Sequence, residues 1–216
     1  MKKIKTQATL KAVFGLLSMN MNLQGIINDC KTGNRKAQKT LFEGFSRDFL
    51  RLSFRYLTDK QYAEDACLEA FALIFEGFKH FEYQSDAQTE AWMKRIVVNQ
   101  SLKILRKTKS LLYQQIPEDD FIESNEIGIE EDINGRELLE MLGNLPDGYR
   151  TVFNLYVVEG YAHNEIAAIL NISEGTSRSQ LFKAKATLKL MIEKQSYDGV
   201  PTPSVCDNFP KNALTE

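Results

Sequence analysis

Residues 165–180 read EIAAILNISEGTSRSQ, and this stretch decides the fold of the chain. It is typical of a helix, a turn of three residues and a second helix that begins after the capping residue Ser173. A turn this short holds the two helices at a steep angle, so the second helix can enter a DNA major groove. The stretch therefore predicts a helix-turn-helix that reads a nucleic acid.

The second helix of this motif has two distinct faces. Spacings of four, three and four keep one set of residues on the face that packs on the first helix: Ser177, Leu181, Ala184 and Leu188. The opposite face, near the helix start, carries the candidate DNA-binding residues Thr176, Arg178, Ser179, Phe182 and Lys183. Arg178 is the candidate for a bidentate guanine contact, and Lys183 for a phosphate contact. An ordinary helical hairpin with a solvated basic face is the alternative for this motif taken alone.

Composition and motif content narrow the class of protein. The 216 residues are 43% hydrophobic and 26% charged, as in a soluble globular protein. Cys30, Cys67 and Cys206 are scattered, which argues against a disulfide framework and fits a reducing cytosol. His80 and His163 lack neighbouring ligand residues, so no metal site is expected. Because the chain has neither a phosphate-cradling glycine loop nor a nucleophile motif, we expect no cofactor and no enzyme activity.

Hydrophobic periodicity divides the chain into two small helical domains of an all-α fold. Residues 23–109 form the first domain, and residues 135–195 form the second, which contains the helix-turn-helix. Residues 110–134 hold eight acidic residues and no Lys or Arg, so we expect a flexible acidic linker; a nucleic-acid mimic is the alternative. Residues 1–22 are predicted to be a disordered extension rather than a targeting segment, and residues 196–216 a disordered tail.

Three helices outside the central motif have clear boundaries in the sequence. Asp59 is positioned to cap a helix that runs to about Lys79, and a second helix is expected from about Thr89 to Lys107. Trp92, on that second helix, is expected in the core. In the second domain, Pro146 opens a helix that ends near residue 160.

The formal net charge of −2 is unfavourable for a DNA-binding protein, but the charge is unevenly distributed. Between residues 91 and 109 there are six basic residues and no acidic one: Lys94, Arg95, Lys103, Arg106, Lys107 and Lys109. The second helix of the helix-turn-helix carries five more basic residues: Arg178, Lys183, Lys185, Lys189 and Lys194. Since the negative charge lies mostly in the linker, two basic faces remain for contacts with phosphates.

Three segments in this order resemble regions two and four of bacterial RNA polymerase sigma factors. Residues 59–71, DKQYAEDACLEAF, resemble the polymerase-binding helix of region two, and residues 91–100, AWMKRIVVNQ, look like the promoter-opening helix. Residues 145–153, LPDGYRTVF, through residues 174–181, EGTSRSQL, are similar to region four. The resemblance covers residues 23–193. Two domains with a short linker are typical of the extracytoplasmic-function (ECF) group.

This resemblance implies roles for particular residues. Asp65, Glu69 and Phe71 would dock on core RNA polymerase. The minus-ten promoter element would be engaged by Lys94, Arg95, Asn99, Lys103 and Arg106, and the minus-thirty-five element by the outward residues of the helix-turn-helix named above. The implied partners are core RNA polymerase, promoter DNA and an anti-sigma factor, in the cytoplasm and without membrane insertion. Cys67 and Ala70 depart from the family pattern, and Ala162 replaces a frequent cap residue.

Two other functions remain open at this point. A stand-alone transcriptional regulator would use the first domain as a sensor or for dimerisation, and it would bind duplex DNA tightly by itself. A helical adaptor would use residues 71–78 as a groove for a partner, and Arg178→Ala would leave its function intact. A sigma factor would instead depend on the polymerase to set the spacing of its two basic surfaces, which a flexible tether leaves undefined.

Overall fold

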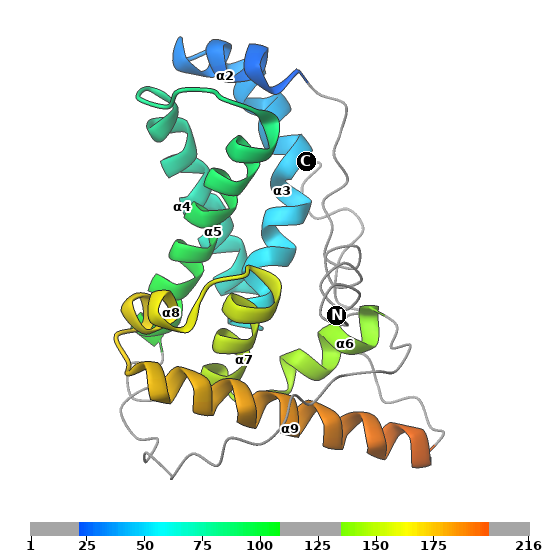
Figure 1. The fold of residues 1–216 in the computed structure, drawn as a ribbon. Coiled ribbons are helices and arrows are strands. Elements are labelled where there is room, and N and C mark those ends of the chain that lie inside the picture. The colour runs from blue at the N-terminus through cyan, green and yellow to red at the C-terminus, as the bar shows by residue number, and fades with distance from the viewer. Residues whose placement is uncertain (1–21, 109–134, 199–216) are drawn as a thin grey trace. The chain divides into compact units, whose positions relative to one another are not determined.

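The computed structural model describes residues 22–108 and 135–198, and all regular elements in these ranges are helical (Figure 1). The elements are α2 (Leu23–Lys31), α3 (Arg35–Leu57), α4 (Lys60–Phe78), α5 (Asp86–Thr108), α6 (Gly135–Gly143), α7 (Asp147–Phe153), η1 (Asn154–Val158), α8 (His163–Leu170) and α9 (Glu174–Asp198). The predicted all-α class is therefore confirmed.

The chain divides into two compact units. We call helices α2–α5 the N-unit and helices α6–α9, with η1, the C-unit. The predicted extension up to residue 21, the predicted linker and the predicted tail beyond Asp198 fall outside the described residues. Asn22, which we expected in the extension, caps α2 by accepting a hydrogen bond from the backbone N–H of Gly25 at 3.1 Å. In the part that the structure describes, no helix is long and apolar enough to cross a membrane.

The helices of the N-unit begin where side chains cap them. Asp59 accepts a hydrogen bond from the backbone N–H of Tyr62 at 3.0 Å, so the predicted cap of α4 is confirmed. Helix α5 begins three residues earlier than predicted, at Asp86. The signal that we missed is Ser85, whose hydroxyl oxygen accepts from the backbone N–H of Gln88 at 3.3 Å. A serine at this position satisfies an amide that the first turn of a helix leaves unpaired.

Phenylalanine rings from α3 and α4 form the centre of the N-unit. The Phe71 ring on α4 lies 4.7 Å from that of Phe42 and 5.3 Å from that of Phe49, measured between centroids, and 6.0 Å from that of Phe75. Phe71 is only 3% exposed. Aromatic rings at these separations attract one another beyond the effect of buried area alone, so this cluster holds α3 against α4.

A second aromatic cluster joins the end of α4 to the start of α5. Trp92, the only tryptophan of the chain, lies 4.5 Å from Phe81 and 5.5 Å from Phe78 between ring centroids. A Cβ atom at Gly77 would come within 2.8 Å of the indole ring, so the absence of a side chain there lets the two helices approach closely. Trp92 is half-buried in this packing rather than fully enclosed.

The C-unit is built around the predicted helix-turn-helix. The helix expected from Pro146 to about residue 160 is present, but its last turn, η1, has π geometry, which the sequence pattern did not predict. Asn171 ends α8 in the left-handed conformation with a φ of 55°. The Ser173 hydroxyl then accepts from the backbone N–H of Thr176 at 2.9 Å, which confirms the predicted cap of α9.

Candidate nucleic-acid interface

The two predicted faces of α9 are present in the structure. The face that packs inward is fully or almost fully buried: Ser177, Leu181, Ala184 and Leu188. At about 100° per residue, Arg178 and Lys183 lie about 140° apart around the helix, with Ser179 and Phe182 between them. Arg178 and Phe182 are exposed. The helix therefore presents a face with a polar and aromatic centre and a cation on each flank.

Arg178 has a defined partner on its own helix. The Nη2 atom of Arg178 donates a hydrogen bond to Oε1 of Glu174, one turn earlier, and both side chains are about half exposed. Thr176, on the other flank of the face, places its hydroxyl 2.9 Å from the hydroxyl of Ser173. The side chains at the start of α9 are thus arranged by short-range polar contacts before any ligand is bound.

His163 connects the two helices of the motif. Its Nδ1 atom lies 2.9 Å from the buried hydroxyl of Ser177 on α9, and its ring stacks on Tyr156 of η1 with centroids 4.4 Å apart. Burial lowers the pKa of His163, and the positive charge of Arg178 lowers it further. The neutral ring therefore fixes α8 and η1 against α9 without adding a charge that would repel Arg178.

From the surroundings of His163 we expect acid to destabilise the C-unit. Because the pKa of His163 is lowered on folding, the unfolded chain binds more protons than the folded chain. The contribution of His163 to the free energy of unfolding is therefore fully present above the ordinary pKa of histidine, and it is lost as the pH falls below that value. The slope stays below about 1.4 kcal/mol per pH unit, since one proton is involved. The melting temperature should change less between pH 7.5 and pH 5.5 for His163→Gln than for the parent chain.

His80 supplies the matched control for this experiment. It is the only other histidine, and it lies exposed on the N-unit. His80→Gln should keep the parent's difference between the two pH values. An unchanged difference in His163→Gln would contradict the prediction.

The predicted minus-ten residues occupy α5 of the N-unit. At about 100° per residue, four of the five lie within a stripe of about 80° on the helix surface, and all four are exposed: Arg95, Asn99, Lys103 and Arg106. Lys94 lies about 100° from Arg95, beyond the stripe. It is half-buried and pairs with Glu90 at 3.8 Å between Nζ and Oε2. The structure thus brings four of the predicted residues together and separates the fifth.

The predicted polymerase-docking residues on α4 differ in their exposure. Asp65 and Glu69 are exposed, and Glu69 pairs with Lys103 of α5 at 3.7 Å between Oε2 and Nζ. Phe71 lies in the aromatic core, so its expected docking role requires correction: its side chain is not available to a partner. Leu68 and Leu73, which were not predicted as docking residues, are 55% and 45% exposed on the same helix. These two apolar side chains lie on the same side of α4 as Asp65 and Glu69.

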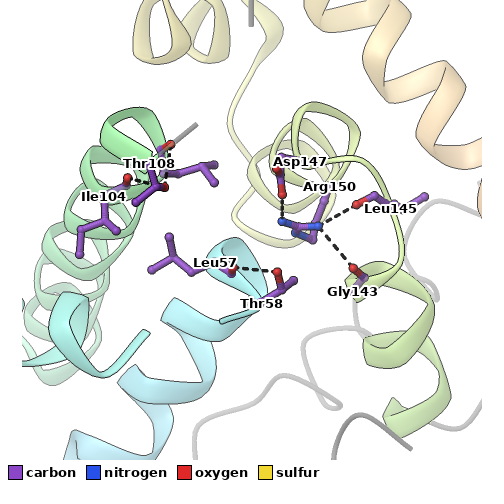
Figure 2. Close-up of polar contacts among 9 residues, drawn as sticks. Leu57, Thr58, Ile104, Thr108, Gly143, Leu145, Asp147 and Arg150 are labelled. Atoms are coloured by element: carbon purple, nitrogen blue, oxygen red, sulfur yellow. Dashed lines mark hydrogen bonds and ion pairs between the residues drawn. The ribbon is translucent and has the colours of Figure 1, made fainter. Parts of the chain in front are cut away.

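A buried ion pair holds the entry to the helix-turn-helix (Figure 2). Arg150 on α7 is 2% exposed and pairs with Asp147 one turn earlier. The Nη1 atom of Arg150 also donates to the backbone carbonyls of Leu145 at 2.7 Å and Gly143 at 3.4 Å, at the end of α6. These bonds satisfy carbonyls that a helix end leaves unpaired, and they fix the corner between α6 and α7.

Known protein families match both units. A family model described as Sigma-70 region 2 matches residues 41–111, which include α4 and α5. A model described as Sigma-70, region 4 matches residues 135–188, which include the helix-turn-helix and the outward residues of α9. Together the two matches take in more than half of the 216 residues.

Individual proteins are also similar to this chain. ECF RNA polymerase sigma factor SigE of Mycolicibacterium smegmatis is 27% identical over 68% of this chain, which spans 58% of that relative's length. ECF RNA polymerase sigma factor SigW of Bacillus subtilis is 25% identical over 79% of this chain and 97% of its own length. Among solved structures, RpoE in complex with the anti-sigma factor NepR from Bartonella quintana has 20% identity and a TM-score of 0.45, covering 72% of this chain and 96% of RpoE.

Proposed function

This chain belongs to the sigma-70 family, as an ECF-type sigma factor that serves RNA polymerase in promoter recognition, and we propose that it does so through three surfaces. Helix α4 docks on core polymerase, the stripe on α5 engages the minus-ten element, and the outward face of α9 reads the minus-thirty-five element. The chain acts as an initiation factor in the cytoplasm and has no catalytic role. An anti-sigma factor is the further partner that the resemblance implies.

The observation that best supports the α9 assignment is the division of that helix into a buried face and an outward face. Side chains on the inner face anchor it in the C-unit, whereas Arg178 and Phe182 on the outward face are exposed. Arg178 then serves as the base reader, Lys183 contacts a phosphate, and Phe182 lies against a thymine methyl group or the sugar backbone. Thr176 and Ser179 complete the face.

The α5 stripe supports the second surface. Arg95, Lys103 and Arg106 provide positive charge along one side of a helix that has no acidic residue after Glu90, and Asn99 adds an amide that can hydrogen-bond a base. Lys94 lies outside the stripe, so we assign it a contact to the backbone of the DNA rather than to a base.

Helix α4 supports the third surface. Leu68 and Leu73 provide exposed apolar area that a partner can bury, and Asp65 and Glu69 add charges that steer the encounter. Binding of core polymerase to this surface would distinguish a polymerase-dependent factor from a stand-alone regulator, which would use the first domain as a sensor or for dimerisation.

Run-off transcription tests the proposal. Core RNA polymerase reconstituted with this chain should start at defined sites on genomic fragments, and Arg178→Ala should lower initiation there roughly 5- to 150-fold, as expected for loss of one bidentate base contact. Lys39→Ala, which removes an exposed cation of α3 outside the three proposed surfaces, is the control and should have little effect. Tight duplex binding without polymerase, and no stimulated transcription, would instead favour the stand-alone regulator.

A further inference from the structure

We infer that Glu174 is a positioning residue for promoter reading: its carboxylate holds the Arg178 guanidinium in the orientation that contacts a base. The inference rests on the proposed role of Arg178 and deepens it. The promoter partner is duplex DNA with a guanine at the position that Arg178 reads.

The contact that carries the inference is the hydrogen bond between Arg178 Nη2 and Glu174 Oε1. Glu174 is the first residue of α9, and the cap at Ser173 fixes the backbone from which its side chain projects. Arg178 follows one turn later, on a flank of the outward face. Glu174 and Arg178 therefore both project from the first turns of α9, next to the cap.

The chemistry of arginine explains how one side chain can do both tasks. The guanidinium is planar and carries five N–H donors, so a carboxylate can occupy one edge while another edge remains available for the two acceptors of guanine. An unrestrained arginine loses much rotational freedom when it binds a base. A carboxylate that orders the side chain beforehand reduces this loss, and the gain appears as discrimination among bases.

The ion pair between Glu174 and Arg178 contributes little to the stability of the C-unit. It is about half exposed, and exposed ion pairs one helical turn apart stabilise a protein only slightly. Its negative charge also lies on the side of the helix that approaches phosphates, where it disfavours DNA of any sequence. Loss of the carboxylate should therefore weaken discrimination while it preserves or raises affinity for DNA in general, and a merely structural role would not produce these opposite changes.

The experiment uses the reconstituted holoenzyme and a promoter fragment that the parent protein selects. Binding is measured for that fragment, for duplexes with each upstream base pair replaced in turn, and for a random-sequence duplex. Glu174→Gln should reduce discrimination roughly 2- to 12-fold at the base pair where Arg178→Ala also reduces it, the range expected for ordering one long side chain. Affinity for the random duplex should stay equal or rise.

Two further variants make the result specific. Glu193→Gln removes a carboxylate from the same helix that pairs with Lys189 at 3.8 Å, and it should leave discrimination unchanged. The double variant Glu174→Gln/Arg178→Ala should discriminate no worse than Arg178→Ala, because the carboxylate acts only through the arginine.

The outcomes separate this inference from the proposed function. If Arg178→Ala reduces discrimination at one base pair and Glu174→Gln does not, the inference is overturned and the role of Arg178 stands. A uniform loss of affinity in Glu174→Gln, for all duplexes alike, also overturns it, since that result indicates a weakened helix start. If Arg178→Ala has no effect at any base pair, the proposed base reader and the inference both fail.

Discussion

Replacing Arg150 with alanine is expected to remove a large part of the stability of the C-unit and to lower its melting temperature. The substitution removes a buried ion-pair partner of Asp147, whose side chain is only 9% exposed, and it takes a hydrogen-bond donor from the carbonyls of Leu145 and Gly143. Breaking a buried pair in this way destabilises a protein by about 3–5 kcal/mol. At about 0.05–0.15 kcal/mol per residue, a unit of this size has only about 3–10 kcal/mol of stability to lose.

Two optical signals distinguish local from global unfolding in this variant. Trp92 lies in the N-unit, so its fluorescence reports that unit alone, whereas far-ultraviolet circular dichroism reports the helices of both. On heating, Arg150→Ala should lose helical signal at a lower temperature than the parent, while the emission of Trp92 changes at the same temperature as in the parent. Lys189→Ala, an exposed cation of the same unit, is the matched control and should melt within about 0.5 kcal/mol of the parent. Equal melting of the two variants would show that the buried pair does not hold the C-unit.

The sequence predicted the helix-turn-helix well because its signals are local. The cap at Ser173 and the spacing of Ser177, Leu181 and Ala184 depend on residues within a few positions of one another. The boundary of α4 followed from Asp59 for the same reason. Periodicity and capping are set by the helix itself, so packing elsewhere in the chain did not overturn them.

Other features depend on packing and could not be predicted from local patterns. Helix α4 carries apolar residues on most of its surface, so periodicity could not separate the buried Phe71 from the exposed Leu73. Burial of Arg150 was equally hidden, because a charged residue is expected at the surface unless it has a partner. The spacing of Asp147 and Arg150, one turn apart, was the available signal. The link between Glu69 and Lys103 joins residues far apart in sequence and requires the folded N-unit.

The second large effect is expected from Phe71→Ala, which should destabilise the N-unit by about 3–5 kcal/mol, as removal of a buried phenylalanine ring generally does. The lost ring contacts those of Phe42, Phe49 and Phe75, and the rigid helices around it cannot close the cavity. Urea unfolding followed by Trp92 fluorescence measures the change within the same unit, as a lower midpoint with an unaltered slope.

Leu73→Ala is the matched control for this prediction, because Leu73 lies two residues further along α4 and is 45% exposed. It should change the urea midpoint little, yet it should weaken binding to core polymerase in a gel-filtration or anisotropy assay, since it removes apolar area from the proposed docking surface. The two variants thus test separate roles on one helix: Phe71 holds α4 in place, and Leu73 contacts the partner. A stable Phe71→Ala chain that fails to bind polymerase would reverse this assignment and restore Phe71 as a docking residue.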